Sequence, residues 1–287
     1  MRTYQLTIAY DGSRYRGWQR QPDTELTIQG MLEKTIGEMT GYAVEVNGSG
    51  RTDGGVHARA QAASVVLAGK VDDEAFLLGL NEKLPDDIRV FSARLVKNGF
   101  HARRSARGKC YEYTIDTGEK ANPFMRKYTF HYPLTKGRGL NVLAMRRAAL
   151  YLLGTHDFAA FTDRVDEKST VRRIDGIDIV EVADGTDVAD ATDETGRVAE
   201  FGGVKGTGER PGIVRVRYKG SGFLYHMVRI LTGTLLEVGT GKRAPKSVKD
   251  TLESGSRADA GFLAPASGLC LMEVYYGEND RDRISGF

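Results

Sequence analysis

The sequence lacks the segments that direct a chain into or across a membrane. It contains no apolar run of about 18 residues, the minimum for a membrane-spanning helix. The N-terminal sequence, which begins MRTY, lacks the apolar stretch of a secretory signal peptide. We therefore expect a soluble, cytoplasmic protein of 287 residues, long enough for two domains and a sizeable core.

Cysteine and histidine are scarce, which argues against disulfides and metal centres. Cys110 and Cys270 each lie in an alternating apolar run, where a buried free thiol is expected. The five histidines are scattered, and the CxxC and HExxH spacings of common metal sites are absent. We therefore expect no bound metal.

Several nucleotide-binding signatures are also missing. No GxxxxGK[ST] phosphate loop occurs, and Asp53 stands where a dinucleotide fingerprint starting at Gly48 needs its third glycine. The two distant cysteines do not form the PCxxC element of zinc-dependent deaminases. These absences exclude three common classes of nucleotide-handling enzyme.

The net charge of +3 conceals an uneven distribution. Residues 181–200 contain seven acids and one base, a charge of −6, which leaves +9 for the remainder. A basic body is typical of proteins that bind phosphates, although it also fits ordinary surface charge. We interpret residues 183–210, which are nearly devoid of large apolar side chains, as a mobile, solvated acidic insertion.

Hydrophobic periodicity predicts alternating strands and helices in both halves of the chain. The elements expected in the first half are a strand at 3–10, a helix at 27–40, strands at 43–47 and 61–67, a helix at 72–84 and a strand at 88–96. Those of the second half are a strand at 110–116, a helix at 140–153, strands at 174–182 and 213–218, a helix at 224–238, a short helix after Pro245 and a strand at 269–276.

This order predicts the α+β class. The first half reads β-α-β-β-α-β, the ferredoxin-like or split βαβ order, and the second half repeats it with longer connections. We expect two ferredoxin-like halves, residues 1–104 and 105–287, with mainly antiparallel sheets and a central cleft.

The segment 48–58 (GSGRTDGGVHA) is the strongest candidate for chemistry. Its four glycines permit sharp turns and close approach to a ligand. They surround a carboxylate, Asp53, with the guanidinium of Arg51 two residues earlier as a possible partner. Most glycine-rich segments are only turns, so the composition alone leaves a structural role open.

Two other segments combine basic and aromatic residues. Residues 11–22 contain the single tryptophan, Trp18, between arginines, which suits either contact with exposed bases or anchoring of the loop to the core. Residues 100–109 contain clustered bases before Tyr111, which suits either phosphate binding or a solvated linker. A strand tyrosine such as Tyr111 is more often a packing residue.

A final segment, 220–230, brings a glycine-rich turn into an amphipathic helix. Arg229 lies beside the apolar stripe of this helix, and a partly buried arginine requires a partner such as a carboxylate. Pairing with an aspartate would keep that acid ionised and oriented. We interpret His226 as a half-buried histidine without a role in chemistry.

Taken together, these segments resemble the tRNA pseudouridine synthase TruA family. The resemblance covers nearly the whole chain and rests on five motifs in order, at 10–21, 50–58, 100–103, 222–229 and 264–269. The sequence departs from the family pattern at Gly54, where alanine is common, and at Arg104, where an aromatic is frequent. The insertion at 183–210 is longer than the family core needs.

The resemblance implies isomerisation of uridine to pseudouridine at positions 38, 39 and 40 in the anticodon arm of tRNA. It also implies a homodimer without a cofactor. By the same resemblance Asp53 is the catalytic aspartate, Tyr111 the tyrosine stacked on the target base and Arg229 the partner of the aspartate. Arg51 matches a residue associated with extrusion of the nucleotide.

The residue types agree with this chemistry. Exchange of a C1′–N1 bond for a C1′–C5 bond needs one carboxylate and no external nucleophile. A glycosidic hydrolase acting on nucleosides would need a second carboxylate to activate water. The basic body and the aromatics alone would also permit a nucleic-acid-binding module without catalysis. Both remain as alternatives.

Overall fold

The computed structural model describes residues 1–69, 71–134, 139–164, 169–182 and 212–277. The acidic insertion expected at 183–210 therefore lies outside the described residues. Within them, no helix combines the length and apolar character needed to cross a bilayer. Cys110 and Cys270 are both free thiols, the first buried and the second half-buried.

The first half of the chain contains the strands and helices that the sequence predicts. They are β1 (Arg2–Tyr10), α1 (Ile28–Thr40), β2 (Val46–Gly48), β3 (His57–Leu67), α2 (Asp73–Lys83) and β4 (Ile88–Val96). β3 starts at His57 rather than at residue 61, and a short helix that the sequence does not predict, α3 (Ala102–Ser105), follows β4. Side chains cap the two long helices: Thr27 accepts from the backbone of Gly30, and Asp72 from that of Ala75. Gly41, in the left-handed conformation, ends α1.

The second half has longer connections. Its elements are β5 (Ala106–Asp116), β6 (Phe130–His131), α4 (Val142–Ala149), β7 (Gly154–Asp157), β8 (Val171–Val182), β9 (Ile213–Gly220), α5 (Met227–Gly239), α6 (Ser247–Ser254) and β10 (Leu269–Tyr276). Two short strands, β6 and β7, are additions to the predicted set. The helix expected at 140–153 is shorter, because a 3-10 turn at Leu150–Leu152 follows α4.

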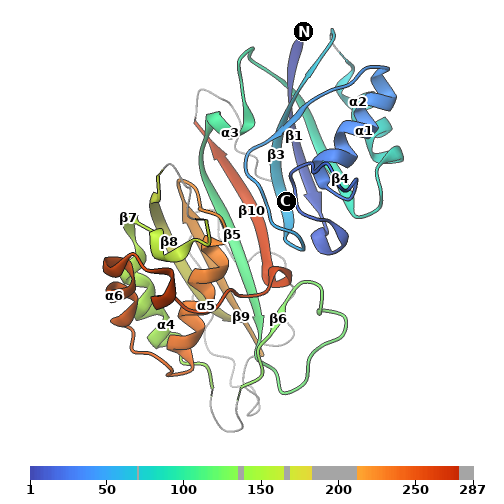
Figure 1. Cartoon of the computed structure of the whole chain (residues 1–287). Coiled ribbons are helices and arrows are strands. Elements are labelled where there is room, and N and C mark those ends of the chain that lie inside the picture. Colours follow the sequence, from blue (N-terminus) through green and yellow to red (C-terminus); the bar gives the residue numbers. More distant parts are fainter. Residues whose placement is uncertain (70, 135–138, 165–168, 183–211, 278–287) are drawn as a thin grey trace, which may run out of the picture.

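The α+β class is confirmed, but the strands of both halves form one mixed sheet rather than two. The strand order is β4-β1-β3-β10-β5-β9-β8-β7, with β2 paired to β3 and β6 to β5. All described pairings are antiparallel except β10 with β3 and β5 with β6. Figure 1 shows β10 and β5 crossing the middle of the molecule, with helices at either end.

The last strand joins the two halves. β10 pairs in parallel with His57 and Ala58 of β3, and antiparallel with β5 on its other side. On the same edge of β3, β2 pairs only with residues 63–65. Because β2 is so short, the rest of that edge is free for β10. The glycine-rich segment that connects β2 to β3 therefore lies at the seam between the halves.

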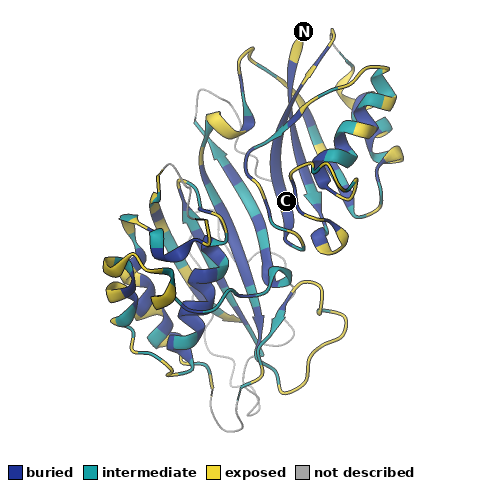
Figure 2. Ribbon diagram, viewed as in Figure 1, coloured by how far each residue is buried: buried dark blue, intermediate teal, exposed yellow. Residues whose placement is uncertain are grey.

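One face of the sheet carries the helices. A row of paired residues crosses five strands on this face: Tyr10, Ala58, Leu271, Tyr111 and Tyr218. At one end Tyr10 packs on Trp18, and at the other Tyr218 hydrogen-bonds Thr232 of α5 at 2.9 Å. Buried residues line these central strands and the inner sides of the helices (Figure 2).

The segment 261–264 crosses α5 in direct backbone contact. A Cβ atom at Gly233, in the middle of α5, would overlap the carbonyl oxygen of Phe262. The backbone amide of Gly261 donates to the hydroxyl of Thr234 at 2.8 Å. Glycine costs helix stability at position 233, but it lets this segment pass close to the helix.

We predict that Gly233→Ala lowers the free energy of unfolding by about 2 kcal/mol, because the backbone of Phe262 must move away. Urea denaturation measures this change. Gly176→Ala is the matched control: no atom lies within 4 Å of a Cβ built there, so its stability should stay within about 0.5 kcal/mol of wild type. Equal stability of the two variants would contradict the close crossing.

Candidate active site

The first part of the glycine-rich segment is fixed by buried hydrogen bonds. Ser49 donates its hydroxyl to the side chain of Gln61 at 2.7 Å, and Gln61 donates to the carbonyl of Gly50 at 3.0 Å. From β5, the ammonium of Lys109 donates to the carbonyl of Ser49 at 2.9 Å. Both halves of the chain therefore hold the backbone that leads to Asp53.

The loop at 11–22 supports the second part. The amide of Trp18 donates to the carbonyl of Thr52 at 3.0 Å, and a Cβ at Gly17 would lie 2.6 Å from the same oxygen. The indole of Trp18 is 2% exposed and packs directly against the backbone of Gly48. Trp18 thus anchors the loop to the core, and the alternative of an exposed stacking platform is wrong.

Asp53 is paired with Arg229 across the seam. The Nη1 atom of Arg229 donates to Oδ2 of Asp53 at 3.0 Å, and its Nε donates to the carbonyl of Ala264 at 2.7 Å. The two side chains are 21% and 12% exposed. The guanidinium is therefore held on two sides, and the carboxylate has a fixed, partly buried position.

Tyr111 forms the floor beside this pair. Its ring is buried and meets Phe223 edge to face, with centroids 5.3 Å apart. Burial raises the pKa of the Tyr111 hydroxyl well above its ordinary value, and the nearby Tyr10 and Asp53 raise it further. The hydroxyl therefore stays protonated at neutral pH.

Arg51 lies at the rim rather than against the carboxylate. Its side chain is exposed, and its Nε donates to the side-chain oxygen of Gln19 at 3.0 Å. The partner of Asp53 is Arg229, not Arg51, although both line the same pocket.

The pocket around Asp53 has a volume of about 390 Å³, within the range of ligand sites. Asp53 is the only carboxylate among its described lining residues. The cations that line it are Arg16, Arg51, Arg103, Lys109, Arg164 and Arg229. A single acid among six cations favours an anionic ligand whose reaction uses one carboxylate.

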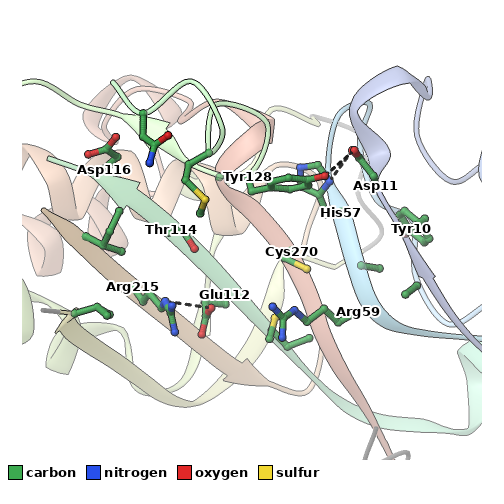
Figure 3. A pocket seen from close by; sticks show the side chains of 18 of the residues that line it. Tyr10, Asp11, His57, Arg59, Glu112, Thr114, Asp116, Tyr128, Arg215 and Cys270 are labelled. Atoms are coloured by element: carbon green, nitrogen blue, oxygen red, sulfur yellow. Dashed lines mark hydrogen bonds and ion pairs between the residues drawn. The ribbon is translucent and has the colours of Figure 1, made fainter. Parts of the chain in front are cut away.

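A larger cavity of about 830 Å³ lies on the opposite face of the sheet (Figure 3). Glu112 and Thr114 of β5 line it, alternating with Tyr111, which faces the smaller pocket. Three of its polar groups contact one another: Asp11 accepts from Tyr128 at 3.0 Å, and His57 lies 3.3 Å from Asp11. The Tyr128–Asp11 hydrogen bond and a 2.8 Å contact between Nε2 of His57 and the carbonyl of Lys127 tie the first half of the chain to the second. We therefore interpret His57 as a structural residue.

Two further residues line the Asp53 pocket: His226, for which the sequence predicts no role in chemistry, and Lys109, one of the clustered bases at 100–109. Nε2 of His226 lies 3.6 Å from Oδ2 of Asp53, and Lys109 lies beside Gly50. His226 belongs to the same sequence motif as Arg229, and this could have indicated that His226 also lies in the site. Its position depends on a left-handed backbone, which periodicity does not reveal. Among the described residues, no cluster of histidine, cysteine and acids is suited to hold a metal.

A carboxylate held by arginine in a cation-lined pocket is typical of an enzyme active site that takes an anionic substrate. Comparison with known proteins identifies the family. A family model described as tRNA pseudouridine synthase matches residues 6–103 and 148–277. The chain belongs to this family, and it is an isomerase.

Relatives match along almost the whole chain. The protein named tRNA pseudouridine synthase A 2 of Bacillus thuringiensis subsp. konkukian (strain 97-27) is 38% identical over 277 residues, covering 96% of this chain and 100% of the relative. The tRNA pseudouridine synthase A of Bacillus sp. (strain KSM-64) is 39% identical over 276 residues, with the same coverage. That of Clostridium botulinum (strain Alaska E43 / Type E3) is 38% identical over 277 residues, again covering 96% and 100%.

The protonation of Lys109 generates a pH-dependent prediction. Burial lowers the pKa of its ammonium to about 8, and the charges of Arg103 and Arg172 contribute. In the unfolded chain lysine keeps its proton to about pH 10. Between these values the unfolded state binds more protons, so rising pH stabilises the folded state through this residue.

We therefore compare the free energy of unfolding of wild type with that of Lys109→Met. The difference, wild type minus variant, should rise by about 1–2 kcal/mol between pH 7.5 and pH 10, a magnitude that already allows for the partial exposure of Lys109. Urea denaturation at a series of pH values measures this difference. Lys242→Met, which removes an exposed lysine, is the control. A difference for Lys109→Met that does not change with pH would contradict the assignment.

Proposed function

We propose that the protein converts uridine to pseudouridine at positions 38, 39 and 40 in the anticodon stem-loop of tRNA, with Asp53 as the nucleophile on a flipped-out uridine. The observation that carries this proposal is a carboxylate that stands alone among the described lining residues of the pocket, paired with Arg229 beside the buried ring of Tyr111. The family and the names of the relatives supply the substrate class.

The charge of the pocket supports binding of an RNA strand. Cations around its rim neutralise backbone phosphates, and an extruded nucleotide enters between them. Arg51 is exposed on the rim, and its guanidinium can occupy the position that the uracil vacates. The cost of unstacking, a few kcal/mol, is partly offset by phosphate contacts and by stacking on Tyr111.

The reaction requires one carboxylate. The C1′–N1 bond breaks, uracil turns within the pocket, a C1′–C5 bond forms, C5 loses a proton and N1 gains one, so that no atom is gained or lost overall. Asp53 supplies the covalent partner during this exchange. Because the Tyr111 hydroxyl stays protonated, we propose that it relays the C5 proton as a neutral hydroxyl and does not act as a phenolate base.

A hydrolase is the less suitable alternative. Activation of water normally needs a second carboxylate across the sugar from the first, and the described lining of this pocket contains only Asp53. A non-catalytic RNA-binding module would not account for a carboxylate held by arginine amid phosphate-binding cations, where it repels RNA.

The family resemblance also implies a cellular location and an oligomeric state, and we include both in the proposal. We propose a cytoplasmic homodimer whose protomers each use the pocket described above. Residues 1–104 form one α+β unit carrying the Asp53 loop, and residues 105–287 form a second that supplies Tyr111 and Arg229.

We predict that Asp53→Asn lowers pseudouridine formation at least about 1000-fold, because the amide is not a nucleophile. Its affinity for tRNA should stay within about threefold of wild type. Unmodified tRNA incubated with each protein, followed by carbodiimide-blocked reverse transcription, locates pseudouridine. Asp175→Asn, which alters an acid on β8 outside the pocket, is the control and should retain wild-type activity.

Three results would count against the proposal. Pseudouridine formation at the wild-type rate by Asp53→Asn would remove Asp53 from catalysis. Release of free uracil by the wild-type protein would favour the hydrolase. Absence of pseudouridine in the anticodon arm after incubation with wild-type protein would favour a binding module or another substrate.

A further inference from the structure

His226 has an unusual backbone. Its φ angle is +62°, and among the described residues it is the only one other than glycine with a positive φ. A left-handed conformation costs a residue with a side chain about 1 kcal/mol or more and persists where its surroundings require it. Glycine would take this conformation without strain, so the imidazole itself has a role at the start of α5.

The imidazole lies between two carboxylates. Its Nδ1 is 2.6 Å from Oδ2 of Asp163, and its Nε2 is 3.6 Å from Oδ2 of Asp53. The ring of Tyr225 stacks on it, with centroids 3.7 Å apart and planes inclined by 25°. The stacking and the Asp163 contact together fix the plane of the imidazole and direct Nε2 toward Asp53.

Asp163 is itself held from behind. Its Oδ1 accepts from Nε of Arg257 at 2.7 Å, and Nη1 of Arg257 donates to the carbonyl of Gly261 at 3.0 Å. Burial opposes the charge on Asp163, but hydrogen bonds from His226 and Arg257 outweigh it and lower the pKa of the Asp163 carboxyl. A polar chain thus runs Arg257–Asp163–His226–Asp53–Arg229.

The two neighbours of Asp53 in this chain approach the same carboxylate oxygen. Arg229 and His226 approach Oδ2 of Asp53, and the described residues make no hydrogen bond to Oδ1. The hydrogen bond from Arg229 restrains rotation of the carboxylate about its Cβ–Cγ bond. A second group on Oδ2 restricts this rotation further, because turning the carboxylate would move Oδ2 away from both partners. The 3.6 Å separation exceeds a hydrogen bond, and such contacts shorten when substrate excludes water.

We propose that His226 is a positioning residue, held by Asp163, that fixes the Asp53 carboxylate so that Oδ1 faces the nucleotide. This inference rests on the proposed role of Asp53 as the nucleophile. It predicts that the chemical step depends on His226 and, through it, on Asp163. Binding of RNA depends on neither.

The variant His226→Asn tests the contact with Asp53. An asparagine amide nitrogen occupies the place of Nδ1, so the Asp163 contact is retained and the group facing Asp53 is lost. Asparagine also tolerates the left-handed conformation. We expect the single-turnover rate of pseudouridine formation to fall about 10- to 100-fold, with Kd for a tRNA stem-loop and the urea midpoint unchanged.

The variant Asp163→Asn tests whether the contact between Asp163 and His226 matters for the reaction. It keeps the shape of the side chain and removes its charge, and we expect a rate several-fold below wild type with unchanged Kd. Because Asp163 acts through His226, the double variant should be no slower than His226→Asn alone. His156→Asn, a histidine of β7 outside the pocket, is the control and should have the wild-type rate.

The outcomes separate this inference from the proposed function. A wild-type single-turnover rate in His226→Asn, while Asp53→Asn is inactive, overturns the positioning role alone. A weaker affinity for tRNA with an unchanged single-turnover rate assigns His226 to RNA contact instead. Rate losses that add in the double variant show that Asp163 does not act through His226. If His226→Asn does not fold, Asp163→Asn decides by the same rate and Kd. An active Asp53→Asn overturns both proposals.

Discussion

The ion pair between Asp53 and Arg229 depends on the union of the two halves of the sheet. Asp53 follows β2 in the first half, whereas Arg229 lies in the first turn of α5 in the second. They meet because β10 takes the part of the β3 edge that the short β2 leaves free. Without that strand, neither half could hold the carboxylate in a fixed, partly buried position.

The cations of the pocket give this pair its context. A lone carboxylate would repel an RNA strand, but the surrounding lysine and arginines make the local charge strongly positive. Attraction for the backbone is therefore spread over the rim, while the negative charge is confined to one place. A carboxylate oriented in this way is suited to react with a nucleotide held by its phosphates.

The sequence predicted the individual strands and helices better than the pairing of the strands into one sheet. Periodicity and caps such as Thr27 and Asp72 placed the helices, since these are local signals. The single sheet depends on pairing between β3 and β10, which are distant in the chain, and no local pattern encodes it. The family resemblance pointed to Asp53, Tyr111 and Arg229, which the structure places in one pocket. The sequence left the anchoring of Trp18 open as one of two alternatives, and it could not reveal the strained backbone of His226.

The central claim is that one carboxylate at the seam acts on an extruded uridine. The most direct test is a crystal structure of the protein with a tRNA anticodon stem-loop that contains 5-fluorouridine at the target position, since fluorine blocks loss of a proton from C5. The account predicts a flipped nucleotide over Tyr111, with its sugar or base in contact with Asp53. A target that remains stacked in the RNA, or RNA bound in the cavity on the opposite face of the sheet, would contradict it.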